Sequence, residues 1–86
     1  MPEICRFYGI IIAMFYDDHN PPHFHARYGS HKSAIRIDDF AVLEGFLPPR
    51  AMGLVMEWAA IHKGELLLEW KAVNEKKPLF PIEPLK

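Results

Sequence analysis

The fold of this chain is decided by one stretch, Asn20–Ile37, which reads NPPHFHARYGSHKSAIRI. The stretch predicts two strands joined at Gly29-Ser30, because glycine at the first position of a two-residue loop fits a type II′ turn. The turn fixes the cross-strand register and pairs His25 with Ala34. Successive side chains of a strand point to opposite faces of its sheet, so the hairpin is expected to have two faces of different character.

One face of the predicted hairpin is apolar and the other is basic. The apolar face collects Phe24, Ala26, Tyr28, Ile35 and Ile37. The basic face collects His23, His25, Arg27, Lys32, Ala34 and Arg36. A slip of one residue in the register would bury the charges. We therefore expect the apolar face to lie on the core and the basic face to point outward.

Further strands are expected on both sides of the hairpin, because β-branched and aromatic residues favour strands. In chain order the expected strands are Ile4–Tyr8, Ile10–Tyr16, the two strands of the hairpin, and Phe40–Leu43. The first two meet at Gly9, and a turn at Asp38-Asp39 leads into the last. Pairing across that turn predicts that Phe40 and Val42 lie on the core face.

Two helices are predicted after the strands. Pro48-Pro49 suits the first turn of a helix, and Gly64 is expected to end or kink that helix, with a second helix over Glu65–Val73. The apolar positions at helical spacing are Ala51, Leu54, Val55, Trp58, Ile61 and His62, then Leu66, Leu67, Trp70 and Val73. The predicted fold class is α+β: a small antiparallel meander of four to five strands, packed on one face by two C-terminal helices.

The chain of 86 residues is long enough for one small domain, which we place at residues 1–76. Residues 77–86 are expected to form an extended proline-rich tail, because every third residue from Pro78 to Pro84 is proline, the period of polyproline II. The apolar residues that follow the prolines would then share one edge. Docking of that edge on its own domain is favoured over docking on another chain.

Composition narrows the class of protein. The formal net charge of −1 argues against a general polyanion binder, although a local basic face remains compatible with it. A single cysteine, Cys5, excludes an internal disulfide and fits a reducing cytosol. The N-terminus lacks the pattern of an export signal, and the apolar run Ile10–Phe15 is too short to span a bilayer. A cytoplasmic location is therefore expected.

The two histidines of the basic face are candidate metal ligands. His23 and His25 stand two residues apart on one strand, so both imidazoles can reach one ion, such as zinc or another first-row divalent metal. Asp18 and His19 in the preceding loop are the candidates for a further ligand. The alternative is that the histidines bond to loop backbone or stay half solvated. The sequence leaves both interpretations open.

Nucleophilic catalysis is disfavoured by the sequence. Cys5 lies on an early strand without an evident base, and apolar burial is the usual fate of such a cysteine. The paired carboxylates at Asp17-Asp18 and Asp38-Asp39 are typical of turns with solvated charges. No catalytic residue is assigned, and an enzymatic function is disfavoured.

The basic face is also a candidate contact surface for a partner or an anion. The residues proposed for that contact are Arg27, Lys32, Arg36, His23 and His25. Such a face can bind phosphates without sequence specificity, or it can meet a protein, since arginine and aromatic residues are enriched at interfaces.

Several segments resemble a bacterial family called domain of unknown function 4160. They are Arg6–Ile10, Met14, Asp18–Gly29, Leu43–Gly45, Leu47-Pro48, Glu57-Trp58 and His62. The resemblance implies a gene often encoded beside a second small domain, in toxin–antitoxin-like pairs, and brings no catalytic residues. The expected function is a small cytoplasmic binding module that engages a protein partner encoded nearby, with nucleic acid as a further candidate. The alternative is a divalent-metal-binding protein or a metal-dependent hydrolase that uses the His-x-His strand motif.

Overall fold

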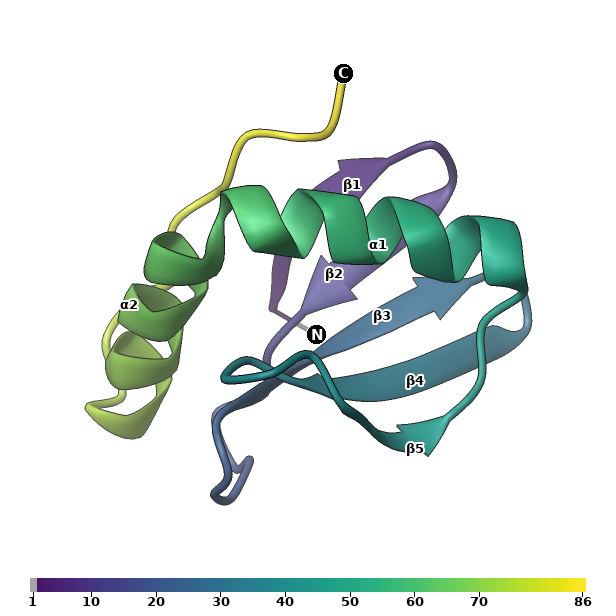
Figure 1. Ribbon diagram of the computed structural model, residues 1–86. Coiled ribbons are helices and arrows are strands. Elements are labelled where there is room, and N and C mark those ends of the chain that lie inside the picture. The colour runs from purple at the N-terminus through teal and green to yellow at the C-terminus, as the bar shows by residue number, and fades with distance from the viewer. Residues whose placement is uncertain (1) are drawn as a thin grey trace.

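A computed structural model describes residues 2–86 as a five-stranded sheet and two helices. The strands are β1 (Glu3–Phe7), β2 (Ile10–Ala13), β3 (His23–Tyr28), β4 (His31–Arg36) and β5 (Val42–Gly45). Each strand pairs antiparallel with the next, so the sheet order is the chain order. Figure 1 shows α1 (Pro49–Ile61) lying across one face of this sheet, and α2 (Lys63–Asn74) turning away at its end. The predicted α+β meander is confirmed.

The central hairpin has the predicted register. Tyr28 pairs with His31 and His25 pairs with Ala34, and Gly29 has the positive φ of +60° that the first position of a type II′ turn requires. Phe24 and Ile35 are fully buried on the core face. The local turn chemistry and the alternation of side chains therefore agree on which face is buried.

The first hairpin turns at two residues with positive φ, Tyr8 at 49° and Gly9 at 80°. Positive φ at both central positions is the geometry of a type I′ turn, whose twist matches that of the flanking strands. The second strand is shorter than predicted and ends at Ala13 instead of Tyr16. Beyond Ala13 the chain leaves the sheet and enters the loop that precedes β3.

The last strand differs from the prediction. It covers Val42–Gly45 instead of Phe40–Leu43, and its first residue, Val42, pairs with Ile35. Val42 is not buried but 48% exposed, because β5 is the edge strand and lies away from α1 (Figure 1). Phe40 adopts a positive φ of 59° in the preceding turn and is half-buried.

The two helices separate at His62, whose φ of −112° and ψ of 24° are not helical. The prediction that the first helix ends or kinks at Gly64 is therefore wrong by two residues, and Gly64 lies in the first turn of α2. The stripe that α2 buries consists of Leu66, Glu69, Trp70 and Val73. Leu67 lies beside this stripe and is exposed, as is Ile61 at the end of α1, so both predicted core positions are wrong.

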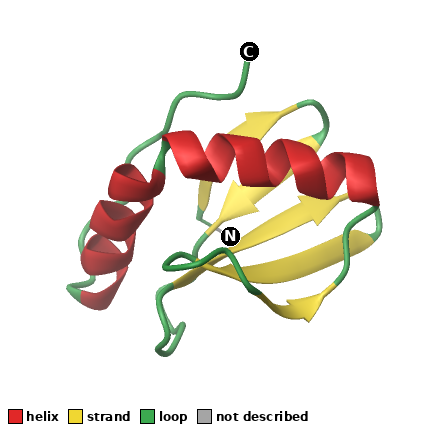
Figure 2. Ribbon diagram, in the orientation of Figure 1, coloured by secondary structure: helices red, strands yellow, loops and turns green. Residues whose placement is uncertain are grey.

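The core lies between α1 and the sheet, which Figure 2 shows as separate layers. Trp58 is fully buried and packs against Phe7 and Phe24, with ring centroids 5.6 and 6.2 Å away. The opposite face of the sheet is open over its centre, where it forms a groove. Among residues 2–86, neither helix has the length and apolarity needed to cross a bilayer.

Residues 77–86 contain neither helix nor strand and run back along the domain (Figure 1). Ile82 is 4% exposed, and its backbone N–H donates to the carbonyl of Ile4 at 2.9 Å. The indole N–H of Trp58 donates to the carbonyl of Glu83 at 2.8 Å. The tail therefore docks on its own domain.

Candidate metal centre

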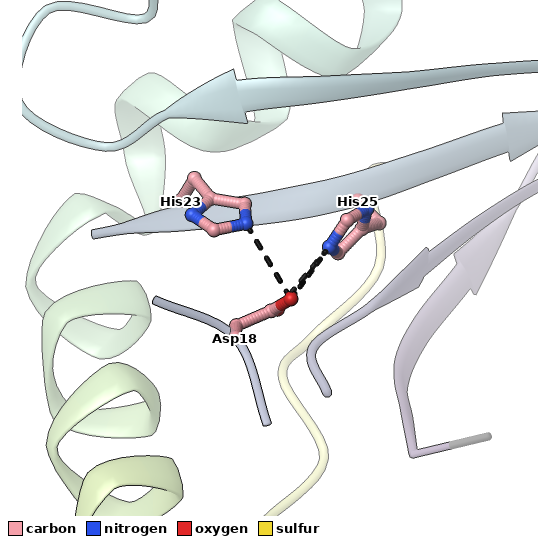
Figure 3. A group of neighbouring side chains, drawn as sticks. All are labelled: Asp18, His23 and His25. Atoms are coloured by element: carbon pink, nitrogen blue, oxygen red, sulfur yellow. Dashed lines mark hydrogen bonds and ion pairs between the residues drawn. The ribbon is translucent and has the colours of Figure 1, made fainter. Parts of the chain in front are cut away.

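Three side chains converge at the start of β3. Figure 3 shows His23 and His25 pointing from one strand toward Asp18, which comes from the preceding loop. The Nε2 atom of His25 lies 3.1 Å from Asp18 Oδ2, and Nε2 of His23 lies 3.6 Å from Asp18 Oδ1. One potential ligand atom from each residue lies within 4.8 Å of the other two.

The orientation of Asp18 is set by its own loop. The backbone N–H of Phe15 donates to Asp18 Oδ2 at 3.1 Å, and the N–H of Asp18 donates to the carbonyl of Phe15 at 3.1 Å. This reciprocal pair of bonds closes the turn after β2 and aims the carboxylate at β3. The side chain is 13% exposed, so the expectation of a solvated turn carboxylate is wrong for Asp18.

Each imidazole is held by its surroundings. His23 Nδ1 lies 2.7 Å from the carbonyl of Pro21 and donates to it, because a carbonyl oxygen can only accept, and this bond directs Nε2 toward Asp18. The ring of His23 packs 5.3 Å from Trp70, and the ring of His25 packs edge-on to Phe15 at 4.6 Å. The His23 side chain is only 12% exposed.

This arrangement has the chemistry of a metal centre. Two imidazoles and one carboxylate form the donor set of many catalytic zinc and non-haem iron sites. Ligands about 2.1 Å from a tetrahedral ion lie roughly 3.4 Å apart, so small side-chain rotations would be enough for these three to reach one ion. The Pro21 carbonyl provides the outer bond that ordinarily fixes a ligating histidine.

Two further residues of the loop lie nearby without joining the group. His19 and Asp17 are exposed and line the open hollow beside the histidines. Of the two residues expected to complete the metal shell, the structure brings Asp18 to the histidines and leaves His19 outside the group of ligand atoms.

A groove continues from this centre along the outer face of the sheet. One row across the sheet pairs Ala13 with His25, His25 with Ala34, and Ala34 with Glu44. Small alanine side chains on both sides of His25 leave the face hollow, and the cavity has a volume of about 360 Å³. Arg27 and Lys32 pair across β3 and β4 and line the same cavity.

The charges of the basic face are divided into two sets. Arg36 forms two bonds to Asp39, at 2.9 and 2.6 Å, and these bonds hold the pKa of the Asp39 carboxyl well below its usual range. Arg27 and Lys32, in contrast, make no ion pair with any residue from 2 to 86. Of the basic residues predicted for anion contact, these two are therefore the available ones.

Glu44 is a residue of the groove that the sequence did not indicate. An uninterrupted pairing would place Leu43 opposite Ala34 and turn Glu44 to the core face. An irregularity between Ala34 and Ile35 shifts the register, so that Glu44 pairs with Ala34 and joins the outer face. A bulge of this kind leaves no trace in the alternation of a single short strand.

Cys5 is buried in the core cluster, as expected. Burial raises the pKa of its thiol and so disfavours the reactive thiolate form.

The sequence of the chain matches a known protein family. A family model described as Domain of unknown function (DUF4160) matches residues 9–71. This span includes the three converging side chains, Arg27, Lys32 and Glu44. No curated protein matches the chain, and no solved structure matches it.

Proposed function

The chain belongs to the DUF4160 family, and we propose that it is a divalent-metal-binding protein whose ion is held by Asp18, His23 and His25. The observation that carries the proposal is the convergence of one ligand atom from each of these residues within 4.8 Å. Imidazole ligands favour first-row transition metals such as zinc or iron over magnesium and calcium.

The surroundings of the three residues support a site for binding and chemistry over a closed structural site. Structural zinc sites use four protein ligands, whereas catalytic sites use three and leave a position for water or substrate. Here three ligands border an open hollow that also contains His19 and Glu44. An ion in such a site would lower the pKa of a bound water and polarise a ligand oxygen.

The test is metal analysis of untagged protein by mass spectrometry, followed by titration of zinc, iron(II) and manganese(II) by calorimetry. We expect one ion per chain. His23→Ala and His25→Ala should each lower the affinity by more than about 100-fold, since losing a ligand costs more than losing its outer bond. Asp18→Asn should also weaken binding, because it removes the negative charge while keeping an acceptor for the Phe15 N–H.

The matched control is His19→Ala, which removes an imidazole from the same loop without touching the three ligands. It should leave affinity and stoichiometry unchanged. Circular dichroism of every variant checks that loss of metal does not reflect loss of fold. Stoichiometric metal that survives the loss of both His23 and His25, or no metal binding by the intact protein, would refute the proposal.

A second candidate function is binding of a protein partner at the sheet edge beside the groove. It is favoured by a separate observation: Val42, Leu43 and Phe46, on and next to β5, are exposed large apolar side chains. An edge strand with exposed apolar residues is a ready template for association.

The candidate partner is the protein encoded by the neighbouring gene, which the family resemblance implies. In calorimetry with that protein, Leu43→Glu should weaken binding at least tenfold, because a charge would enter an apolar contact. Leu68→Glu, at a leucine on α2 that is more exposed than Leu43 (59% against 40%), is the control and should bind normally. Equal binding by both variants, or no binding by the unaltered chain, would exclude this function.

A further inference from the structure

The cavity of the outer sheet face and the hollow beside the metal centre are neighbours on the same face of the sheet. Both are lined by His25, Ala34 and Glu44. A molecule seated over the alanines would therefore have the proposed metal centre at one end and the Arg27–Lys32 pair at the other. The cavity of about 360 Å³ is at the small end of the range of ligand sites.

The two ends of the groove lie one strand repeat apart. His25 and Arg27 are separated by two residues on β3, which corresponds to roughly 6.6 Å along a strand. Because Arg27 has a long side chain and projects from the same face of β3 as His25, its guanidinium can reach a phosphoryl group that is bound beside the histidines. Arginine supplies a planar fork that binds phosphate oxygens in pairs, and lysine adds a second positive charge.

The remainder of the groove is apolar on its floor and at one wall. Ala13 and Ala34 flank His25 on the neighbouring strands, Ile11 pairs with Arg27, and Phe15 lies in the loop just after β2. A flat floor of small side chains beside an aromatic ring accepts a planar group. The carboxylate of Glu44 on the opposite rim provides an acceptor for a hydroxyl group.

We infer that the groove binds a small phosphate monoester with a planar apolar portion, of the size and chemistry of a nucleoside monophosphate. Its phosphoryl group bridges the metal held by Asp18, His23 and His25 and the side chains of Arg27 and Lys32. The inference rests on the proposed function for the metal contact, while the contact with the two basic residues is independent of it. A nucleic acid fits less well, because the basic surface is limited to this pair and the chain has a net charge of −1.

The experiment titrates adenosine 5′-monophosphate and adenosine into the full chain by calorimetry, once metal-free and once loaded with zinc. Adenosine monophosphate should bind at least tenfold more tightly than adenosine, and zinc should strengthen only the binding of the monophosphate. Arg27→Gln and Lys32→Gln should each weaken monophosphate binding about tenfold, the effect of losing a charge-assisted hydrogen bond. Neither variant should change the zinc stoichiometry.

Arg50→Gln is the control, since Arg50 lies at the start of α1 and is exposed away from the groove. Equal affinity for adenosine and its monophosphate, or full affinity in the Arg27→Gln variant, would overturn the inference. Tighter binding of a single-stranded oligonucleotide than of the mononucleotide would overturn the assigned ligand size. If zinc does not bind but monophosphate binding still depends on Arg27, the proposed metal function fails while the basic contact stands.

Discussion

Glu69 occupies a core position on α2 that an apolar residue ordinarily fills. Its side chain is fully buried in the stripe between Leu66 and Val73. One carboxylate oxygen accepts the backbone N–H of Phe80 at 3.0 Å, which ties the tail to the helix. The other oxygen has no hydrogen-bond partner among the described residues. Burial therefore raises the pKa of the Glu69 carboxyl above its ordinary value.

This raised pKa makes the stability of the protein depend on pH in a defined direction. The folded state holds the Glu69 proton more tightly than the unfolded state, so the free energy of unfolding falls as pH rises from the unfolded pKa through the folded one. Glu69→Gln keeps an acceptor for Phe80 and removes the titration. We expect this variant to be more stable than the parent at pH 7.5, and to have a smaller advantage at pH 4.5.

Urea denaturation at the two pH values measures this difference. Glu57→Gln, at an exposed position of α1, serves as the control and should not alter the pH dependence. An advantage of Glu69→Gln that is equal at both pH values would contradict the assignment of this titration to Glu69.

Among the secondary-structure elements, the sequence predicts correctly those whose position depends only on neighbouring residues. The β3–β4 hairpin is predicted correctly because its turn, its alternation and its apolar face all lie within 18 residues. The bounds predicted for β5 are wrong, because a bulge and an edge position change which side chains of this strand are buried. Gly45 marks this irregularity: its φ is +80°, and a Cβ there would lie 2.2 Å from the carbonyl oxygen of Lys32. A glycine at the end of a short strand can also indicate a turn or the end of the strand, so the sequence alone does not predict the irregular pairing of β5.

The same distinction applies to the candidate site. The juxtaposition of His23 and His25 follows from a two-residue spacing on one strand. The inward turn of Asp18 depends on bonds to Phe15 across a loop, and polar residues before a Pro-Pro pair predict only a solvated turn. Glu44 reaches the groove through the bulge of β5. The polar residues that lie beside the histidines are therefore determined by the tertiary arrangement of the loop and of β5, which the local sequence does not reveal.

At the scale of the whole molecule, residues 77–86 complete one side of the hydrophobic core. Small domains bury a limited share of their surface, and residues 77–86 add apolar contacts where α1 meets β1. Ile82 is 4% exposed and belongs to the core cluster, while Leu79 and Leu85 pack at its margin. The backbone N–H of Ile82 donates to the carbonyl of Ile4, and the indole N–H of Trp58 donates to the carbonyl of Glu83. These two hydrogen bonds fix the position of the segment.

The tail should therefore contribute to global stability although it contains no regular structure. Ile82→Ala should lower the free energy of unfolding by about 2–5 kcal/mol, as truncation of a buried isoleucine does. Glu83→Ala changes an exposed side chain whose residue contributes only its carbonyl to Trp58, and it should alter stability by less than about 0.5 kcal/mol. Both values come from urea denaturation followed by the fluorescence of the two buried tryptophans, Trp58 and Trp70. Equal stability of the two variants would show that the tail is a passive appendage. A large loss in Ile82→Ala alone would mean that the domain needs its last residues in order to complete its core.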